Sequence, residues 1–444
     1  MIPDRSRLAI LGLDGLSLDM TRTLCGLTNL PALAGIVDDP RAHAVRSELP
    51  ELSPVNWTSL ATGLGPEEHG VFGFTGIGSD DYAVRVGDAD DIRAPRFWER
   101  LGARGLTCKV VNWPNAYPAR PFPGMLVAGF VAPELSRACH PPVLARILGG
   151  KGYRLEADTA RGKDDPDLLL RELHAMIASR RLALDLLWPD LAFDCFALVL
   201  TETDRLFHFL LHAVLDQTHP LHGACMAWLS AFDALVGEFL ERFATLPEPR
   251  RLMVVADHGF APLITEVDVN AWLVRHGFLR LAGRPRHELD AAVIAPGSRA
   301  LALDPGRVFV HVRDRFARGS VPPAERRAVA RDVAEGLMAL RFKGEPVMER
   351  IFTGEELYPG AIENGFAAQV PDLVCQARPG FSLTAKWDRG EIFGRFGRSG
   401  CHAAQGALWF DTRGSRPERM RDAGREITRH FEGRDGLTSG LVTA

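Results

Sequence analysis

The chain has 444 residues, 46% of them hydrophobic, and a formal net charge of −4. This length is enough for one large α/β domain with an inserted cap, or for two domains. The near-neutral charge gives no reason to expect nucleic acid or an anionic membrane as a partner, and no apolar run approaches the ~20 residues that span a bilayer.

The amino terminus contains a short apolar run that predicts a buried strand, Leu8–Leu13 (LAILGL). Asp14 follows it, at the strand end where open α/β sheets bind ligands, and is a candidate ligand or an ordinary strand-ending residue. A signal peptide has a longer apolar region, so we expect a cytoplasmic protein. The seven cysteines are scattered and form no CxxC pair, which predicts free thiols.

The segment Leu52–Gly63 (LSPVNWTSLATG) predicts the start of a helix. Ser53 is a favoured N-cap residue, and Pro54 suits the first helical turn. One interpretation is a simple cap; the other is a nucleophile at the positive end of a helix, where anions bind. Thr58 is a rival hydroxyl, but it falls in the middle of the predicted helix. His69, in the Gly/Pro-rich turn that follows, is expected to be structural.

Helix and strand patterns then alternate, which favours a mostly parallel sheet. The predicted helices cover residues 97–105, 168–188, 224–243, 269–276, 322–340 and 418–431. The predicted extended segments and strands cover residues 44–49, 106–112, 125–131, 193–200, 251–256, 278–281, 307–312, 347–352, 373–376 and 406–410. We expect residues 132–165 to be an irregular insertion outside the sheet, and the last dozen residues to be disordered.

A Pro-rich loop, Trp113–Gly124 (WPNAYPARPFPG), leaves the carboxyl end of one predicted strand. Its two aromatic residues, Trp113 and Tyr117, and its amide residue, Asn115, are candidates for contacting a substrate. The alternative is that these side chains only pack within the loop.

Acidic and histidine residues follow the later strands. Asp204 and His208 are four residues apart, so a helix would place both on one face, although exposed helix faces often carry such pairs. Asp257 and His258 are adjacent at a strand end, where burying both is costly unless they are paired or metal-bound. His402 lies in a Gly-rich loop before the last strand.

Three carboxylates and three imidazoles therefore lie at or near strand ends, together with a serine at a helix start. Such groups suit two divalent ions that clamp a phosphoryl group during its transfer. Spacing alone does not assign the six residues to two sites.

Five motifs occur in the order seen in the alkaline phosphatase superfamily, and they most resemble its type I phosphodiesterase/nucleotide pyrophosphatase branch. They are Asp14, LSPVNWTSLATGLGPEEHG, TETDRLFH, VVADHGF and SGCH. Further stretches, VVNWPNAYPARPFPGMLVAGF, FTGEELYPG and PDLV, resemble prokaryotic members, so the resemblance covers roughly residues 7–412. It implies a three-layer α/β/α sandwich with a mostly parallel sheet over residues 1–412, cap insertions near 74–95, 132–165 and 283–300, and a helix and tail over 413–444.

The resemblance also implies roles for individual residues. The ligands of one metal ion would be Asp14, Ser53, Asp257 and His258, and those of the other would be Asp204, His208 and His402. Ser53 matches the family's nucleophile, usually threonine in the diesterases. Asn56 matches an asparagine that holds a non-bridging phosphate oxygen. Zinc is the metal that we expect first. Manganese and iron are the alternatives, because carboxylate and imidazole ligands suit all three metals.

The sequence also departs from relatives of this kind. Trp57 stands where animal-type enzymes have histidine, so nucleotide-style contacts do not follow, although Trp57 is a candidate substrate contact. The sulfatase spacing of proline and arginine after the nucleophile is absent. No arginine clamp like that of the monoesterases is evident. Arg205 and Arg398 border the site and could neutralise a dianion, or they are surface or supporting residues.

We therefore expect two-metal hydrolysis of a phosphodiester, or of a small phosphate or phosphonate ester, through a phosphoseryl intermediate on Ser53. An alternative is a biosynthetic phosphatase or phosphotransferase that acts on one specialised metabolite. A third hypothesis is a non-catalytic, metal-dependent binding protein. The expected partner is a small phosphate ester, with no nucleic acid or membrane, and a homodimer is left open.

Overall fold

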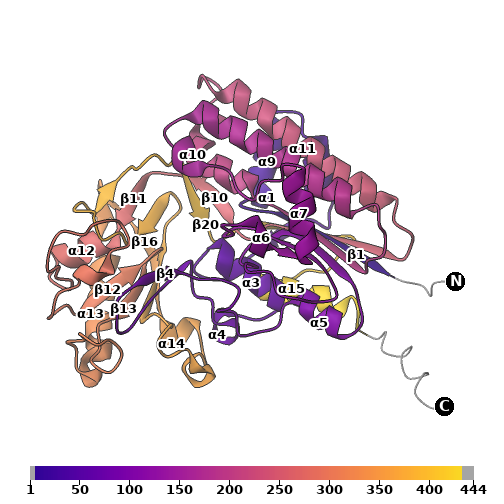
Figure 1. Cartoon of the computed structure of the whole chain (residues 1–444). Coiled ribbons are helices and arrows are strands. Elements are labelled where there is room, and N and C mark those ends of the chain that lie inside the picture. The colour runs from indigo at the N-terminus through magenta and orange to yellow at the C-terminus, as the bar shows by residue number, and fades with distance from the viewer. Residues whose placement is uncertain (1–5, 433–444) are drawn as a thin grey trace, which may run out of the picture.

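The computed structural model describes residues 6–432, and its centre is an eight-stranded sheet in the order β2-β21-β9-β1-β8-β5-β6-β7 (Figure 1). The strands are β1 (Arg7–Leu13), β2 (His43–Val45), β5 (Cys108–Trp113), β6 (Gly124–Ala128), β7 (Cys139–His140), β8 (Cys195–Leu200), β9 (Arg250–Val255) and β21 (Ala407–Asp411). The five central strands from β9 to β6 are parallel, and the pairings of β21 with β9, β2 with β21 and β7 with β6 are antiparallel. The predicted mostly parallel sheet is confirmed.

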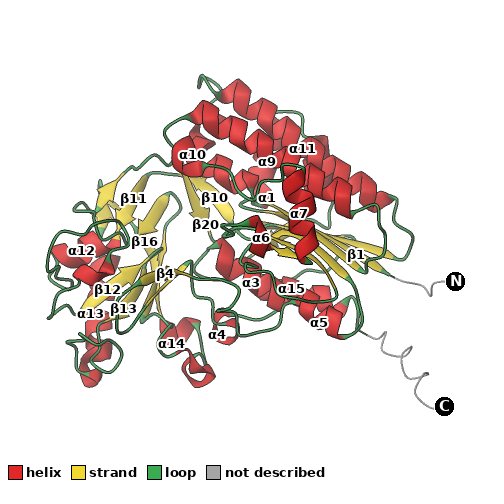
Figure 2. Cartoon of the chain, viewed as in Figure 1, coloured by secondary structure: helices red, strands yellow, loops and turns green. Residues whose placement is uncertain are grey.

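Helices cover both faces of this sheet (Figure 2). One layer contains α1 (Leu18–Leu27), α2 (Pro31–Val37), α9 (Pro166–Leu187), α10 (Glu202–Leu215) and α11 (His222–Ala244). The opposite layer contains α3 (Ser53–Thr62), α5 (Phe97–Ala103) and α15 (Met420–Arg429). The protein is thus the expected three-layer sandwich.

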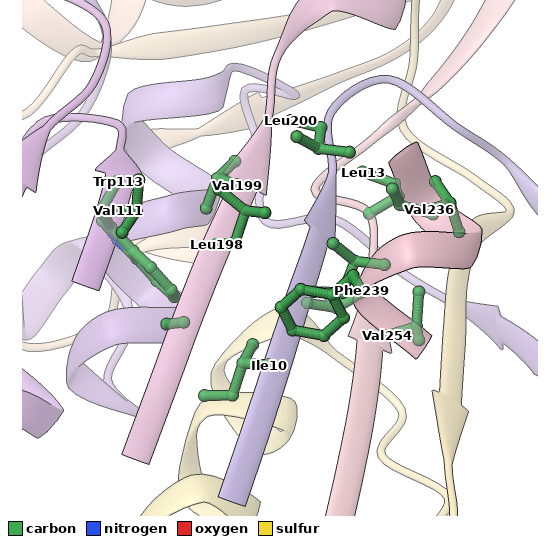
Figure 3. Close-up of a cluster of buried hydrophobic side chains, with 14 of the residues drawn as sticks. Ile10, Leu13, Val111, Trp113, Leu198, Val199, Leu200, Val236, Phe239 and Val254 are labelled. Carbon is green, nitrogen blue, oxygen red and sulfur yellow. The ribbon is translucent and has the colours of Figure 1, made fainter. Parts of the chain in front are cut away.

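The core lies between the sheet and these helices. Figure 3 shows Ile10, Leu198 and Val254 from three neighbouring strands beside Val236 and Phe239 of α11. These side chains are almost fully buried. Central strands covered on both faces need continuous apolar runs rather than alternation, and for this reason the strands could be located in the sequence.

Among the described residues, α11 is the one helix that is long and apolar enough to cross a membrane by length and composition, which corrects the expectation that no run reaches that size. One such helix is weak support for a membrane span. Trp228 and Phe232 of α11 are buried in the core. Its buried Asp233 accepts hydrogen bonds from the backbone N–H groups of Ala32 (3.1 Å) and Leu33 (2.8 Å) in the first turn of α2. This is the packing of a core helix.

Residues 259–403 build a second unit beside the large sheet, on the left in Figure 1. Its strands are β10 (Gly259–Pro262), β11 (Thr265–Asp268), β12 (Ala300–Leu303), β13 (Arg307–Val310), β16 (Met348–Thr353), β17 (Leu373–Ala377), β18 (Phe381–Thr384), β19 (Phe393–Gly394) and β20 (Gly400–Ala403), with short β14 (Arg341–Phe342) and β15 (Glu345–Pro346). Its helices are α12 (Val269–Arg275), α13 (Arg326–Met338) and α14 (Gly354–Leu357). The hairpin β3 (Thr75–Ile77) and β4 (Val84–Val86) joins this unit through Tyr82, whose hydroxyl lies 2.7 Å from His311.

The prediction of an irregular insertion at 132–165 is wrong. This segment contains α6 (Leu135–Ala138), the edge strand β7, α7 (Pro142–Gly150) and α8 (Thr159–Gly162). Its proline and glycine residues mark helix ends rather than a continuous loop, since Pro142 begins α7 and glycines end both α7 and α8. The division of the chain into a catalytic domain, caps and a tail stays a prediction.

Smaller corrections concern two predicted strands. Residues 278–281 do not form one, because only Leu281 pairs, in an isolated bridge with Ile294. The extended segment 44–49 forms a strand only as far as Val45. The other predicted elements are found with shifts of a few residues at their ends. The expected disorder of the last dozen residues lies outside the described residues.

Candidate metal centre

The carboxyl ends of three neighbouring parallel strands bring the acidic residues together. Asp14 follows β1, and Asp257 follows β9. Helix α10 begins two residues after β8 ends and carries Asp204 in its first turn, with His208 one turn on. Because β8, β1 and β9 are adjacent, the three carboxylates meet at one edge of the sheet.

His402 reaches the same edge by a different route. The antiparallel ladder of β10 and β20 places His402 opposite Phe260, next to His258, and the two imidazole rings stack with centroids 3.7 Å apart. The Nδ1 of His402 lies 2.8 Å from the carbonyl oxygen of Glu51. If Nδ1 donates that bond, the Nε2 lone pair is free to bind a cation.

Asp204, His208 and His402 form one group of possible metal ligands. The Nε2 atoms of the two histidines are 3.0 Å apart, and those of His402 and His208 lie 3.1 Å and 3.4 Å from Asp204 Oδ1. Lone pairs that converge in this way suit a shared cation.

Asp14, Asp204 and His258 form a second group, which shares Asp204 with the first. Nε2 of His258 lies 3.6 Å from Asp14 Oδ1 and 3.8 Å from Asp204 Oδ1. Asp257 adds an oxygen 3.4 Å from the same nitrogen, and this Oδ2 is buried without a hydrogen-bond partner. An orphaned buried carboxylate oxygen fits a bound cation, since burying it unpaired is costly.

Ser53 lies against this second group. Its hydroxyl is 3.4 Å from Asp14 Oδ1 and 3.3 Å from His258 Nε2. Ser53 is the first residue of α3, and the N-cap is Leu52, which has no side-chain cap bond. The idea that Ser53 caps the helix is therefore wrong, and its oxygen is directed to the acidic cluster instead.

Burial and neighbouring charges shift the pKa values of the clustered Asp and His side chains in different directions. Burial, reinforced by Asp204, raises the pKa of Asp257 to about 7, and burial with Asp257 and Asp204 raises that of Asp14. Burial also acts to raise the pKa of Asp204, but the His208 and Arg205 charges hold it well below its usual range. Burial lowers the pKa of His402 to about 3, so this imidazole is neutral at physiological pH, as a metal ligand must be.

A cleft of about 910 Å³ opens onto this cluster between the large sheet and the second unit. Ser53, Asp204, His208 and His402 line it from the cluster side, together with both predicted arginines, Arg205 and Arg398. From the second unit it is lined by charged and aromatic residues, among them Glu266, Asp304, Lys386, Arg389 and Phe396. A larger hollow of about 1220 Å³ also reaches His402, but Ser53 does not line it.

Comparison with known proteins identifies the family. The type I phosphodiesterase/nucleotide pyrophosphatase family profile matches residues 8–406. The chain belongs to this hydrolase family. No significant match to a curated protein was found.

Two solved structures share the fold. Phosphonoacetate hydrolase from Sinorhizobium meliloti 1021, in complex with phosphonoformate, matches with a TM-score of 0.61 at 14% identity, over 96% of either chain. Murine ectonucleotide pyrophosphatase/phosphodiesterase 5 matches with a TM-score of 0.53 at 14% identity, over 96% of this chain and 95% of its own. At 14% identity such a likeness shows the fold alone.

In this phosphodiesterase-family protein, Trp57 orients the candidate metal ligand Asp14. It does not take the role of a substrate contact, for which it was a candidate. Its side chain is fully buried, and its indole N–H donates a 3.2 Å hydrogen bond to Asp14 Oδ2. The bond leaves Oδ1 of Asp14 facing Ser53 and His258. No spacing rule connects these residues in the sequence.

We expect Trp57→Phe to lower the affinity for the metal by roughly 10- to 100-fold, because groups that orient metal ligands typically contribute that much. The ring would still fill the core. Metal titration of the chelated protein, followed by calorimetry, measures the effect. Trp113→Phe, which alters a neighbouring indole without a bond to the cluster, is the control; equal losses in both variants would contradict a specific role for the Trp57 bond.

Arg205 has a similar supporting position but also faces the cleft. Its Nη1 donates to Asp204 Oδ2 at 2.5 Å, its Nη2 pairs with Glu156 at 3.4 Å, and the guanidinium lies 4.4 Å from the Phe130 ring centroid. Asp204 thus presents Oδ1 to the imidazoles while Oδ2 is held by the arginine. Arg398 lines the cleft as expected.

The side-chain amide of Asn56 is hydrogen-bonded to the backbone before α3, contrary to the expectation that it holds a phosphate oxygen. Its Oδ1 accepts from the backbone N–H of Glu48 at 2.7 Å, and its Nδ2 donates to the carbonyls of Glu48 (3.2 Å) and Leu52 (3.1 Å). The amide therefore fixes the turn before Ser53 and has no donor left for substrate in this arrangement.

The three candidates from the Pro-rich loop also lie away from the cleft. Trp113 is buried in an edge-to-face contact with Trp57, at 5.4 Å between ring centroids. The Tyr117 hydroxyl donates to Glu134 at 3.3 Å. Asn115 donates to the hydroxyl of Thr58 at 3.0 Å. Thr58, the rival candidate for the nucleophile, is thus hydrogen-bonded in the middle of α3. Trp113 and Tyr117 therefore have structural contacts with residues outside the loop, Trp57 and Glu134, and do not pack only within it as the alternative proposed.

His69 has the structural role that was expected. It is buried, and its two ring nitrogens lie 2.9 Å from the Ser59 hydroxyl and 3.1 Å from the backbone N–H of Val71.

We expect Asp257 to make the metal-free protein less stable as pH rises. The raised pKa of Asp257 means that its folded carboxyl still holds a proton between pH 3.8 and about 7, where the unfolded chain has released it. The contribution of Asp257 to stability therefore falls with rising pH across this window, and bound metal removes the effect by replacing the proton. The lowered pKa values of His69 and His402 act in the opposite direction, so the comparison is made with Asp257→Asn, which keeps both histidines. In the presence of a chelator the melting temperature of wild type, relative to that of Asp257→Asn, should fall by a few °C from pH 5 to pH 8, and zinc should restore more at pH 8. A difference between the two chelated proteins that does not change with pH would contradict this.

Proposed function

We propose that this protein hydrolyses a phosphodiester, or a small phosphate or phosphonate ester, with two divalent ions and through a phosphoseryl intermediate on Ser53. The observation that carries the proposal is the Ser53 hydroxyl, which lies 3.3–3.4 Å from two members of a buried Asp/His group, on a residue that lines the cleft. Family membership supports the hydrolytic class.

The donor set fits two cations. Around Ser53 lie Asp14, Asp257 and His258. The other group contains His208 and His402, and Asp204 is common to both groups. When bound, divalent ions would lower the pKa of the Ser53 hydroxyl and offset charge on phosphate oxygens. Zinc is our first choice because imidazole and carboxylate ligands suit it, with manganese or iron as alternatives.

The start of α3 supplies the other groups that a phosphoryl transfer needs. The first backbone hydrogen bond of the helix joins Asn56 N–H to the Leu52 carbonyl, so the N–H groups of Ser53 and Val55 precede the ladder and are directed to the helix start. We propose that they hold non-bridging phosphate oxygens in place of the Asn56 amide, aided by the helix dipole.

The reaction would proceed in two displacements at phosphorus. The Ser53 hydroxyl gives up its proton, its oxygen attacks in line and forms a bond to phosphorus while the bond to the leaving-group oxygen breaks, and the leaving group takes up a proton and departs into the cleft. Water then attacks the phosphoseryl group, the bond from phosphorus to the Ser53 oxygen breaks, a proton of the water returns to Ser53, and phosphate or a monoester leaves. Arg205 and Arg398, on the cleft wall, offset the charge of the substrate.

Known relatives are compatible with this assignment. The Sinorhizobium hydrolase has been crystallised with phosphonoformate and with phosphonoacetate, and an inactive threonine-to-alanine variant of the murine protein has a solved structure in complex with AMP. These ligands share a phosphoryl or phosphonyl group, which is the feature that we extend to this chain.

Turnover of two simple esters tests the generic proposal. The protein is loaded with zinc or manganese, its metal content is measured, and hydrolysis of bis-p-nitrophenyl phosphate is compared with that of p-nitrophenyl phosphate. We expect faster turnover of the diester. No turnover of either ester, with metal shown to be bound, would contradict a general esterase.

A specific observation favours the alternative of an enzyme for one specialised metabolite. The second unit lines the cleft with fixed ion pairs, Arg389 with Glu266 at 2.8 Å and Lys386 with Asp304 at 2.8 Å, which is the kind of wall that selects one polar substrate. Phosphorylation of Ser53 without turnover of simple esters would indicate this enzyme. Full ligand binding by a Ser53→Ala variant, without any turnover by the parent, would indicate the non-catalytic binding protein.

A further inference from the structure

A second cavity, of about 670 Å³, lies behind one wall of the cleft. Phe74, Thr75 and Phe130 line both spaces, and Pro54, next to Ser53, lines the second one. The cavity is enclosed by the β3–β4 hairpin on one side and by β13 on the other, and it contains no residue of the Asp/His cluster.

The cavity is lined by a buried arginine without a counter-charge. Arg307 is only 2% exposed, and its Nε and Nη2 donate to neutral oxygens, the Asp304 carbonyl at 2.8 Å and the Thr75 hydroxyl at 3.2 Å. Among the described residues no carboxylate forms an ion pair with it. Asp304, whose carbonyl accepts from Arg307, directs its carboxylate to Lys386 at 2.8 Å and to the backbone N–H of Ala385.

Other charges around the cavity are already engaged. Arg315 pairs with Asp372 at 3.0 Å, and Arg85 pairs with Asp81. The remaining acidic groups in the lining are Asp88, Asp90 and Asp91, which accept hydrogen bonds from backbone N–H groups or from Arg120. The remaining cation, Arg93, is exposed.

Burial of this guanidinium carries a cost that no ion pair among the described residues offsets. Burial lowers the pKa of Arg307 to about 10, while Tyr358 and Asp304 act in the opposite direction, so the side chain is still charged at neutral pH. Buried charges in proteins are normally paired, and a guanidinium with an unused N–H edge is suited to bidentate binding of a carboxylate or phosphate. The guanidinium also packs against Gly73, where a Cβ would lie only 2.4 Å from Arg307 Cζ.

We propose that this cavity is a binding site for the oxyanion of a small molecule, a carboxylate or phosphate group, and that Arg307 is its main contact. The oxyanion would accept hydrogen bonds from the free edge of the guanidinium, within the wall made by Gly73 and Thr75. The site is separate from the Asp/His cluster and does not depend on the reaction assigned to Ser53. The anion belongs either to a second acidic group of the substrate, reaching past Phe74, or to an independent small molecule.

The test is calorimetric titration of the metal-loaded full chain with sodium sulfate at constant ionic strength. We expect binding that is at least tenfold weaker in Arg307→Gln, the usual loss for a charge-assisted hydrogen bond. Arg85→Gln, which alters an exposed ion pair on the same cavity, is the matched control and should bind sulfate within about twofold of wild type.

One further variant and one further measurement keep the proposal testable. Gly73→Ala retains the charge but displaces the guanidinium, so it should also weaken sulfate binding. The melting temperature of Arg307→Gln without sulfate should be equal to or above that of wild type, because an unpaired buried charge is removed. A lower melting temperature in that variant, together with sulfate binding equal to wild type, would assign Arg307 a purely structural role and overturn the proposal. Absence of sulfate binding by wild type would do the same.

Kinetics separate the two sources of the anion. If the site receives a second acidic group of the substrate, sulfate should raise KM for a diester with a carboxylate on one aryl group but not for bis-p-nitrophenyl phosphate. If it receives an independent molecule, sulfate should change both KM values by the same factor. Either result supports the anion site only if it is lost in Arg307→Gln, because sulfate that competes with the substrate at the Asp/His cluster would raise both KM values in wild type and in that variant alike. Sulfate binding that is weakened by Arg307→Gln in calorimetry decides whether the site exists even if neither ester is hydrolysed.

Discussion

Replacing Ser53 with alanine should lower turnover by roughly 10³-fold or more at saturating metal, because removal of a covalent nucleophile has effects of at least this size. The substitution removes one oxygen from the first turn of α3 and leaves the six Asp and His side chains of the cluster in place. Metal content, measured by mass spectrometry of the purified protein, should therefore stay close to that of wild type.

Thr58→Ala is the matched control for this variant. Thr58 lies in the same helix and is also buried, but its hydroxyl accepts from Asn115 and does not contact the Asp/His cluster. It should keep kcat within a few-fold of wild type. If Ser53→Ala stays active while Thr58→Ala is inactive, the nucleophile has been assigned to the wrong hydroxyl.

The second large effect is expected for Asp204→Asn. Asp204 is the ligand common to both groups, and its Oδ1 lies within 3.8 Å of three imidazole nitrogens, those of His208, His258 and His402. An amide carries no charge and coordinates divalent ions weakly, so both sites lose a ligand at once. Metal content should fall from two ions per chain to fewer than one, and turnover by roughly 10³-fold or more.

Asp216→Asn, at the C-cap of the same helix, is the control for Asp204→Asn. Asp216 is exposed, and its carboxylate accepts only from Thr218, so metal content and turnover should not change. Two bound ions in Asp204→Asn would show that Asp204 is not shared and that the two groups are separate sites.

The sequence predicted the half of the site that follows apolar strands. β1, β8 and β9 are continuous hydrophobic runs because helices cover both faces of the sheet, and each run ends shortly before a conspicuous Asp. Parallel strands place such residues at one edge regardless of the intervening chain, so Asp14, Asp204 and Asp257 could be grouped from the amino-acid sequence alone.

His402 shows what strand patterns alone do not reveal. It joins the cluster because β20 pairs with β10 in a register that sets His402 opposite Phe260, and this pairing spans more than 140 residues. Short antiparallel pairings of this kind have no periodicity in the sequence, so His402 could be listed as a candidate ligand, but only the resemblance to a known family assigned it to one of the two metal sites.

The residues next to Ser53 were assigned wrongly for a related reason. The resemblance implied that Asn56 holds a phosphate oxygen, and Trp57 was a candidate substrate contact, but hydrogen bonds to partners far away or in the preceding turn decide where these two side chains point. Asn56 binds the backbone around Glu48, and Trp57 binds Asp14. Buried polar groups take whichever partner the packed structure provides, and propensity and spacing do not identify that partner.

The most direct test of the central claim is to trap the covalent intermediate. Metal-loaded protein is mixed with bis-p-nitrophenyl phosphate, or with the natural ester once it is known, and quenched in acid within one turnover; peptides are then analysed by mass spectrometry. We predict the mass of a phosphoryl or phosphoryl-ester group on the peptide that contains Ser53, and specifically on that residue. Turnover without any modified peptide, or a modification on another residue, would contradict the assignment of Ser53 as nucleophile.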